Sequence, residues 1–369
     1  MINWFISDLI KLKFTNRKYL SIKILFLSHK FYPDIGGIEA NSEILATVFS
    51  ESGYKVKILT WTKEKGNKVF PFEVIRSPGI ATLFKEHKWA DVVFENNPCL
   101  RLAWPSLFLN AISVIALRTW ISRTDGKTGI QDILKKKWVG RAKAVIAVSE
   151  SVRKKSWPAA IVIGNPYRIN LFQNLGSSVR IKDFVYLGRL VSDKGVELAI
   201  LAISKLKNLV AEGKLMNANL LLTIIGEGPE RQALETLVKE LNVDDKVSFT
   251  GKLTGDDLVQ TLNQHRFLIV PSLWEEPFGN VALEGMACGC VPLVSNGGGL
   301  PDAVGRAGVV FERGSVDSIV GAIQMVFQNP DLELSLKNAA AEHLENHHPN
   351  VVGKLYLDVI KNAFQQQHK

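Results

Sequence analysis

Cysteine is scarce in this chain of 369 residues, which has only Cys99, Cys288 and Cys290. Three cysteines cannot build a disulfide framework. Cys288 and Cys290 stand too close together, and without nearby histidines, for a zinc site. We therefore expect all three to be small core residues of a protein from a reducing compartment.

The chain also lacks an uninterrupted apolar run long enough to cross a membrane. Its first twenty residues are not a signal peptide, because their charges follow the apolar stretch and no small-residue cleavage site is present. Their apolar residues fall on one helical face and basic residues follow, which is typical of an interfacial amphipathic helix. An over-long start, or a helix packed on the body of the protein, is the alternative.

Two further absences narrow the class of protein. No dinucleotide-binding glycine fingerprint with a following acid occurs, so hydride chemistry is not indicated. The basic residues form no recognisable nucleic-acid motif, so we expect no nucleic-acid partner.

Acidic residues are sparse in the first half: residues 1–180 hold 28 basic and 13 acidic side chains (+15), against 17 and 23 (−6) in residues 181–369. A basic half suits an anionic membrane surface or a phosphate-bearing acceptor; a solvated basic surface is the alternative.

What the sequence does contain is a regular alternation of strand-like apolar runs and helical segments. This pattern, in a chain with 46% hydrophobic residues, is typical of parallel sheets covered by helices. The expected strands are residues 22–28, 56–60, 91–94, 113–117, 144–148, 184–187, 221–225, 247–250, 267–270 and 291–294. We predict an α/β fold of two Rossmann-like doubly wound domains facing a cleft, residues 1–168 and 181–345. A helix at residues 350–369 is expected to pack back on the first domain.

The stretch WEEPFGNVALEGMACGCVPLVSNGGGLPDAV, residues 274–304, combines two acidic residues, Glu276 and Glu284, with glycine-rich loops. A proline and a glycine break the chain between the acids, and Asn280 is expected to cap a helix that begins at Val281. The free N–H groups and the positive end of that helix can hold an anion while a carboxylate faces hydroxyls. A buried strand–loop–helix crossover with a solvated glutamate pair is the alternative.

Other expected strands also end in suggestive loops. GRLVSDKGVE places Arg189 and Lys194 beside a helix start, where two cations suit a diphosphate. GEGPER and GKL follow the next two strands. In the first half, PDIGG supplies Gly36 and Gly37, which let the backbone approach a ligand closely. Their convergence at strand ends indicates a nucleotide-diphosphate site.

Together these motifs resemble the retaining glycosyltransferases of family 4, which have the two-domain GT-B fold. The likeness rests on GRLVSDKG, GEGPER, VSFTG, EEPFGNVALEGMACGCVPLVS and GGLPD, with FYPDIGGIE near the start and the boundary at Asn165. It covers most of the chain and is weaker at residues 70–138. It implies transfer of a sugar from a nucleotide-diphosphate donor to a glycan or lipid-linked acceptor, with retained anomeric configuration, in cell-envelope or exopolysaccharide biosynthesis. Apart from the resemblance, the cysteine usage and the amphipathic, basic start of the chain lead us to expect a cytoplasmic protein, peripheral on the inner face of the membrane.

The resemblance also implies a role for each site residue. Arg189 and Lys194 would hold the diphosphate and stabilise the charge of the leaving group, and Glu276 would bind the sugar hydroxyls. Glu284 would take the ribose hydroxyls. The other implied donor-binding residues act through main chain or close backbone approach: Gly36, Gly37, Gly188, Gly226, Lys252, Leu253, Phe278, Gly279, Asn280 and Val281. The family uses no metal, so we expect neither metal nor cofactor, and the departing phosphate would accept the acceptor's proton.

One position departs from the family pattern. The family carries a histidine near the donor sugar after the strand at 113–117, and Arg118 stands there in this chain. Arginine can bond a sugar hydroxyl or a phosphate but cannot exchange a proton near neutral pH. Arg118 is therefore a further implied donor-binding residue. The alternative function is a catalytically impaired relative that binds a nucleotide or a partner protein, and a sugar epimerase or phosphorylase on the same fold is a third. The pair His347 and His348, without obvious partners, is expected on the surface.

Overall fold

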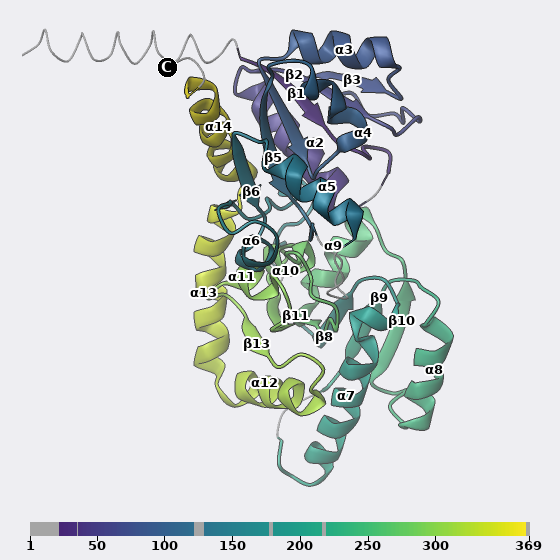
Figure 1. The fold of residues 1–369 in the computed structure, drawn as a ribbon. Helices are drawn as coiled ribbons and strands as arrows, with labels where there is room; N and C mark the ends of the chain where they lie inside the picture. The colour runs from purple at the N-terminus through teal and green to yellow at the C-terminus, as the bar shows by residue number, and fades with distance from the viewer. Residues whose placement is uncertain (1–21, 35, 122–128, 177–179, 216–218, 367–369) are drawn as a thin grey trace, which may run out of the picture. The chain divides into compact units, whose positions relative to one another are not determined.

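A computed structural model describes residues 22–34, 36–121, 129–176, 180–215 and 219–366. The chain folds into two compact units (Figure 1). Unit 1 comprises residues 1–166 and 349–369, and unit 2 comprises residues 167–348. None of the helices in the described ranges is long and apolar enough to span a bilayer. The expectation for the first twenty residues lies outside the described residues.

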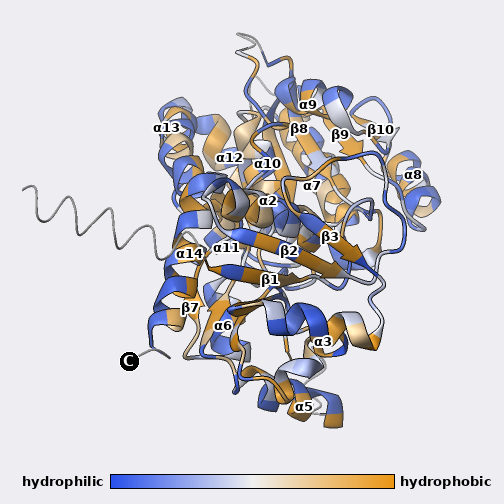
Figure 2. Ribbon diagram, turned by 90° about the horizontal axis from the view of Figure 1, so that it is seen from above, coloured by the Kyte–Doolittle hydropathy of each residue, from blue (hydrophilic) through white to orange (hydrophobic). Residues whose placement is uncertain are grey.

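Unit 1 is built on a seven-stranded sheet in the order β3-β2-β1-β4-β5-β6-β7, in which every pairing is parallel. Strands β1 and β4 are buried almost throughout, because helices cover both faces of a parallel sheet. Figure 2 shows β1 as mainly hydrophobic between more polar outer elements. The strands are β1 Lys23–Leu27, β2 Lys55–Thr60, β3 Glu73–Arg76, β4 Val92–Asn96, β5 Ile112–Leu117, β6 Ala144–Ala147 and β7 Ile161–Val162.

The last helix of the chain, α14, belongs to unit 1. Its Tyr356 is fully buried in the core of this unit, with its ring 5.9 Å from that of Phe94. Gly353 allows α14 to approach α2, since a Cβ there would lie 2.4 Å from Val48. The helical segments of unit 1 are α2 Gly37–Glu51, α3 Ile80–Trp89, α4 Leu100–Ala103, η1 Trp104–Leu107, α5 Ile130–Val139, α6 Glu150–Ser156 and α14 Pro349–Gln365.

Unit 2 repeats the plan with a six-stranded parallel sheet in the order β10-β9-β8-β11-β12-β13. Its strands are β8 Lys182–Leu187, β9 Leu222–Ile225, β10 Val247–Gly251, β11 His265–Val270, β12 Val291–Ser295 and β13 Val309–Phe311. Its helical segments are η2 Ser192–Lys194, α7 Val196–Ala211, α8 Arg231–Glu240, α9 Gly255–Asn263, α10 Asn280–Ala287, α11 Leu300–Val304, α12 Val316–Gln328 and α13 Pro330–Asn346.

Each sheet reverses its strand order beside its first strand, between β1 and β4 in unit 1 and between β8 and β11 in unit 2. Such a switch point leaves a crevice at the carboxyl ends of the strands, which is where doubly wound sheets bind ligands. In unit 2 the loops that leave β8 and β11 carry Arg189, Lys194 and Glu276. The topology therefore places the predicted catalytic residues at the switch point.

Candidate functional site

The loops that follow β8 and β11 are bound to each other through their main chains. The Asp193 carbonyl accepts hydrogen bonds from the N–H groups of Leu273 and Trp274, at 3.0 and 2.9 Å. Gly195 has a φ of +64°, and a Cβ there would lie 2.2 Å from the carbonyl oxygen of Pro271. Glycine is needed at this position because only it allows both this backbone conformation and this approach.

This pairing brings together two of the predicted catalytic residues. The Lys194 ammonium forms an ion pair with Glu276 Oε1, and the Ser272 hydroxyl donates to the same oxygen at 3.0 Å. The Lys194 Nζ also lies 5.4 Å from the centre of the Trp274 ring. The two charged side chains are only 17% and 15% exposed, so their attraction is weakly screened by water. Ser272 and Trp274 were missed from the sequence, although both lie within four residues of Glu276.

The main chain of Glu276 is fixed by the glycine loop after β12. The Gly299 N–H donates to the Glu276 carbonyl at 2.7 Å, and Gly298 pairs with Glu276 as a short parallel bridge. Gly298 has a φ of +66°, and a Cβ on it would lie 2.1 Å from that carbonyl oxygen. The glycine loop after β12, which contains Gly298 and Gly299, thus fixes the main chain of Glu276.

The start of α10 differs by one residue from the prediction. The helix begins at Asn280, and Gly279 rather than Asn280 is its N-cap residue. Gly279 has a φ of +110°, and a Cβ on it would meet Leu300 at 2.4 Å, so glycine is required there. The first N–H groups of α10, including that of Val281, have no carbonyl partner within the helix and can face an anion.

Phe278 is buried, so its part in a site is limited to its main chain. Its ring centre lies 5.6 Å from that of His347, which in turn lies 4.7 Å from His343. The expectation that His347 is on the surface is therefore wrong: this side chain is 9% exposed and packs under the loop before α10. A histidine ring can pack against an aromatic side chain, and sequence spacing gave no sign of that contact.

Glu284 has a partner that sequence reasoning missed. Arg168 donates to Glu284 Oε1 from Nη2 at 2.8 Å and from Nε at 3.2 Å. Burial raises the pKa of the Glu284 carboxyl above its usual value, and the charge of Arg168 offsets only part of that rise. Residues 116 positions apart leave no local signal, so only the fold could identify this pair.

The glycines Gly188 and Gly226 are brought together by the packing of their own loops. A Cβ on Gly226, which has a φ of +150°, would lie 1.8 Å from the Gly188 carbonyl oxygen. Arg189 follows Gly188 directly. Its side chain is exposed, and among the described residues it pairs with no carboxylate. A Cβ on Gly188 would lie 2.7 Å from the Tyr186 hydroxyl oxygen, so packing within the unit accounts for both glycines. Their contact with a donor stays a prediction.

Lys252 and Leu253 follow β10, which lies two strands from β8 at the edge of the sheet. The Lys252 side chain is exposed and Leu253 is half-buried. Within the described part of unit 2, no hydrogen bond or ion pair joins them to the Lys194–Glu276 pair. Their contact with a nucleotide base stays a prediction.

The remaining predicted residues belong to unit 1. Gly37 is the first residue of α2 and Gly36 is its N-cap, in an extended conformation open to any residue. A Cβ on Gly36 would lie 2.2 Å from Glu39 Oε2, which is the end of a flexible side chain. Close backbone approach is thus permitted at Gly36 but is not imposed there by a special φ.

Arg118 is buried and its guanidinium is bound to other side chains. Nε donates to Asn96 Oδ1 at 2.6 Å, and Nη1 donates to Asn165 Oδ1 at 3.0 Å and to the Tyr356 hydroxyl at 2.7 Å. Nη2 is buried with no hydrogen-bond partner among the described residues. Burial lowers the pKa of Arg118, since the network contains no carboxylate. Only Nη2 is left for the predicted contact with a donor.

The partners of Arg118 were not identified from the sequence, although two of them carried a signal. Asn96 ends the buried strand β4 in the run FENN, and Asn165 stands in the Gly-Asn-Pro boundary. Polar residues at the ends of buried strands commonly face a site. Tyr356 gave no such signal, because it sits among the apolar residues of an amphipathic helix.

Comparisons with known proteins relate unit 2 to a family of enzymes. The sequence profile described as "Glycosyl transferases group 1" matches residues 168–343, which is nearly all of unit 2. An uncharacterized glycosyltransferase of Methanocaldococcus jannaschii, MJ1607, is 31% identical over 212 residues, covering 57% of this chain and 52% of its own. Glycogen synthase of Mycobacterium tuberculosis is 32% identical over 164 residues, covering 44% and 38%. The chain thus spans about half the length of these relatives, or less.

Solved structures match over both units. Anabaena HepE, crystallised with UDP and glucose, superposes with a TM-score of 0.74 at 18% identity, covering 92% of this chain and all of that one. Sucrose-phosphate synthase of Thermosynechococcus elongatus gives 0.73 at 19% identity, covering 94% and 100%. These neighbours confirm the predicted α/β fold with two Rossmann-like units. Residues 168–343 of this chain thus match the glycosyl transferases group 1 family, and the chain has the GT-B fold.

Proposed function

We propose that the chain transfers a sugar from a nucleotide-diphosphate donor to a glycan or lipid-linked acceptor, with retention of anomeric configuration, in the synthesis of a cell-envelope or extracellular glycan. The observation that carries the proposal is the Lys194–Glu276 ion pair at the switch point of unit 2. It places one cation and one carboxylate in the loops before α10, whose first N–H groups have no carbonyl partner within the helix. Phosphate and sugar hydroxyls are the two chemistries such a set can bind.

Donor binding exchanges the partners of this ion pair. The diphosphate takes the Lys194 ammonium and the exposed guanidinium of Arg189, and the N–H groups at the start of α10 take a phosphate oxygen. The Glu276 carboxylate is then released to accept hydrogen bonds from the sugar hydroxyls, while Ser272 and the glycine loop keep it in place. Glu284, held by Arg168, accepts from the ribose hydroxyls.

Transfer then proceeds on one face of the sugar. The acceptor oxygen forms a bond to the anomeric carbon on the side from which the diphosphate leaves, so the configuration is retained. The bond from that carbon to the phosphate oxygen breaks, and the acceptor's proton passes to the departing phosphate. Lys194, Arg189 and α10 stabilise the charge that develops on the leaving group, so we expect no metal and no cofactor to be needed.

A donor panel tests this proposal. UDP-, GDP- and dTDP-sugars are assayed for binding and for transfer, starting with UDP-glucose because HepE is described in complex with it. Lys194→Gln and Glu276→Gln should each lower transfer about 100-fold or more, as the loss of one charge-stabilising group does. Lys205→Gln is the control, since this lysine lies on α7 and pairs with the exposed Asp317. Transfer should also persist in EDTA. If no donor binds or reacts, the proposal is wrong.

A second candidate function is a nucleotide-binding protein without transfer, and the buried network of Arg118 favours it. Arg118 stands where the family has a histidine, and its guanidinium already donates three hydrogen bonds to protein side chains. The candidate predicts donor binding with a normal affinity but no turnover, and a gain of transfer in Arg118→His. An active parent protein, with a variant no faster than it, would remove this candidate.

An anionic membrane surface is the partner that we propose on the acceptor side, with the protein peripheral on the cytoplasmic face. Helix α5 supports this: Ile130, Ile133 and Leu134 are 78%, 47% and 53% exposed, and Lys135–Lys137 follow them directly. Exposed apolar residues beside lysines are typical of helices that lie in a bilayer interface. The pair Ile133→Glu and Leu134→Glu should abolish sedimentation with phosphatidylglycerol vesicles, while Ile80→Glu on α3 should not. Equal sedimentation of all variants would contradict it.

A further inference from the structure

Unit 2 has a pocket at the amino ends of its strands, whereas the Lys194–Glu276 pair lies at their carboxyl ends. The pocket has a volume of about 620 Å³, within the usual range for small-molecule sites. It is lined by α13, by the end of α10 and by residues at the amino ends of strands, including Arg266 of β11 and Val291 of β12. Strands of five or six residues are about 17–20 Å long, so this is a separate site.

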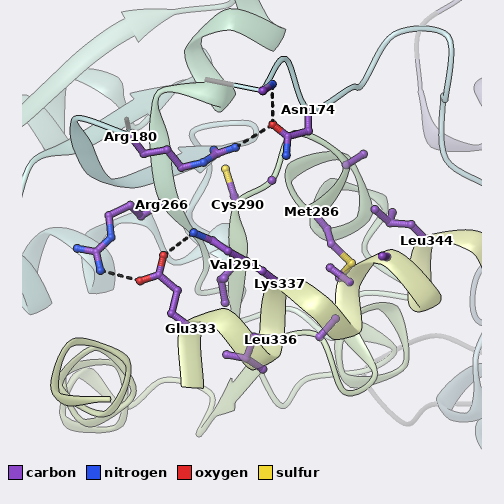
Figure 3. A pocket seen from close by; sticks show the side chains of 16 residues that line it. Asn174, Arg180, Arg266, Met286, Cys290, Val291, Glu333, Leu336, Lys337 and Leu344 are labelled. Carbon is purple, nitrogen blue, oxygen red and sulfur yellow. Dashed lines mark hydrogen bonds and ion pairs between the residues drawn. The ribbon is translucent and has the colours of Figure 1, made fainter. Parts of the chain in front are cut away.

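The lining carries more positive than negative charge. Arg180, Arg266 and Lys337 line the pocket together with Glu333, which is the one carboxylate among the lining residues. Figure 3 shows Glu333 joined to Arg266 and Lys337, and Arg180 turned toward Asn174. Glu333 accepts from Arg266 at 2.7 Å and from Lys337 at 2.6 Å, and Arg266 also meets Asp183 at 3.2 Å. Glu333 and Asp183 therefore form ion pairs with Arg266 and Lys337, and neither carboxylate pairs with Arg180.

Arg180 is held in place by neutral groups. Its guanidinium donates to the carbonyl oxygens of His265 at 2.6 Å and Cys288 at 2.7 Å, and no carboxylate of the described residues pairs with it. A Cβ on Gly289 would lie 2.2 Å from Arg180 Nη2, so the glycine makes room for this guanidinium. A half-buried cation fixed by carbonyl groups is prepared to bind an anion.

Apart from Asn174 beside Arg180, the other side chains of the wall are apolar. Met286 from α10 and Leu336 and Leu344 from α13 line the pocket on the side away from Arg180 (Figure 3). A bare phosphate ion would leave these side chains without a partner, whereas a neutral apolar molecule would leave the charge of Arg180 without one. Both requirements are met by a phosphate group joined to a carbon body.

We propose that this pocket binds a small organic phosphate, with the phosphate between Arg180 and Lys337 and the carbon body against Met286, Leu336 and Leu344. Binding is linked to the donor site through α10. Arg180 donates to the carbonyl of Cys288 just after the end of this helix, and the other end of the helix belongs to the proposed donor site. A ligand that binds the Arg180 guanidinium weakens its hydrogen bond to Cys288 at the end of α10. The position of α10, and hence the affinity for the donor, then changes. This link rests on the proposed function; the binding itself does not.

Phenyl phosphate is the probe, with inorganic phosphate, benzoate and benzyl alcohol as partial mimics, and calorimetry gives the affinities at constant ionic strength. We expect phenyl phosphate to bind more tightly than each mimic. Lys337→Gln should weaken its binding about tenfold, as the loss of one charge-assisted hydrogen bond does. Ala341→Glu, which adds a carboxylate on the exposed side of the lining helix α13, should weaken it at least as much. Lys205→Gln is the matched control and should bind like the parent.

The donor-site variant Lys194→Gln separates the two sites. It should keep phenyl phosphate binding, and Lys337→Gln should keep UDP binding. Equal binding by all variants, or binding lost only with Lys194→Gln, would overturn the pocket. The link predicts that saturating phenyl phosphate changes the Kd for UDP, and that UDP changes the Kd for phenyl phosphate by the same factor. An unchanged Kd would overturn the link, whereas a protein that binds phenyl phosphate but no nucleotide would overturn the proposed function instead.

Discussion

The replacement Tyr356→Phe tests whether Arg118 acts as a brace inside unit 1. It removes only the hydroxyl that accepts from Arg118 Nη1 at 2.7 Å and keeps the buried ring against Phe94. A hydrogen bond to a charged group contributes about 1.5–3 kcal/mol. Nη1 retains its bond to Asn165, so the low end applies and we expect a loss of about 1.5–2 kcal/mol.

This loss converts into a measurable shift of Tm. Unit 1 contains 187 residues, from its segments of 166 and 21. For a unit of this size, each kcal/mol shifts Tm by about 2–4 °C, so Tyr356→Phe should lower the Tm of this unit by about 3–8 °C. Scanning calorimetry and urea unfolding give the values. Tyr32→Phe is the control, since among the described residues its hydroxyl only accepts a long, exposed hydrogen bond from Asn67 at 3.4 Å, and it should change Tm by about 1 °C or less.

A double-mutant cycle with Arg118→Met isolates the pair. If the brace exists, the two replacements together should cost less than the sum of the two alone, by about 1 kcal/mol or more. Additive effects, or a Tyr356→Phe variant as stable as the Tyr32→Phe control, would refute the reasoning. UDP affinity in Tyr356→Phe should equal that of the parent, because the hydroxyl belongs to the brace and not to the donor site.

Three further outcomes follow from the geometry. Gly279→Ala should destabilise the protein by about 2–4 kcal/mol in urea unfolding, because φ is +110° and the new Cβ would meet Leu300; an unchanged midpoint would contradict the required conformation. Burial raises the pKa of Glu95 from 4.5 to about 7, so its contribution to stability is full below pH 4.5 and is lost as pH rises through 7. Glu95→Gln should therefore show a flatter stability profile than the parent from about pH 5 to about pH 8. Arg168→Gln should raise the pKa of Glu284 further, so UDP affinity should begin to fall at a higher pH on acidification than in the parent.

The fold was predictable because buried parallel strands leave long apolar runs. The predicted strands correspond to β1, β2, β4–β6 and β8–β12, and each differs from the structure by no more than two residues at either end. Strands β3, β7 and β13 were missed. The two residues of β7, Ile161 and Val162, are exposed and too few to show a pattern. The sequence EVIR of β3 is only partly buried at the sheet edge, and the three residues VVF of β13 are too few to show a pattern.

Single residues of the candidate site could be predicted from the loop motifs, but the contacts between them could not. Lys194 and Glu276 were each singled out from the strand-end motifs, and the structure pairs them. Their grouping depends on the bonds to the Asp193 carbonyl, which no spacing could reveal. Arg118 shows the opposite case: the motif pointed to a ligand, whereas packing places most of its guanidinium in a protein network that reaches Tyr356.

The return of α14 to unit 1 sets an order for folding during synthesis. Residues 349–365 complete the core of unit 1, yet the ribosome makes them after the whole of unit 2. Nascent unit 1 therefore exposes the aromatic surface that Tyr356 later covers, while unit 2 already has all of its strands. Domains usually finish in order from the N-terminus, and here the order is reversed. A stop codon near residue 348 would leave unit 2 able to fold and unit 1 a target for chaperones and proteases.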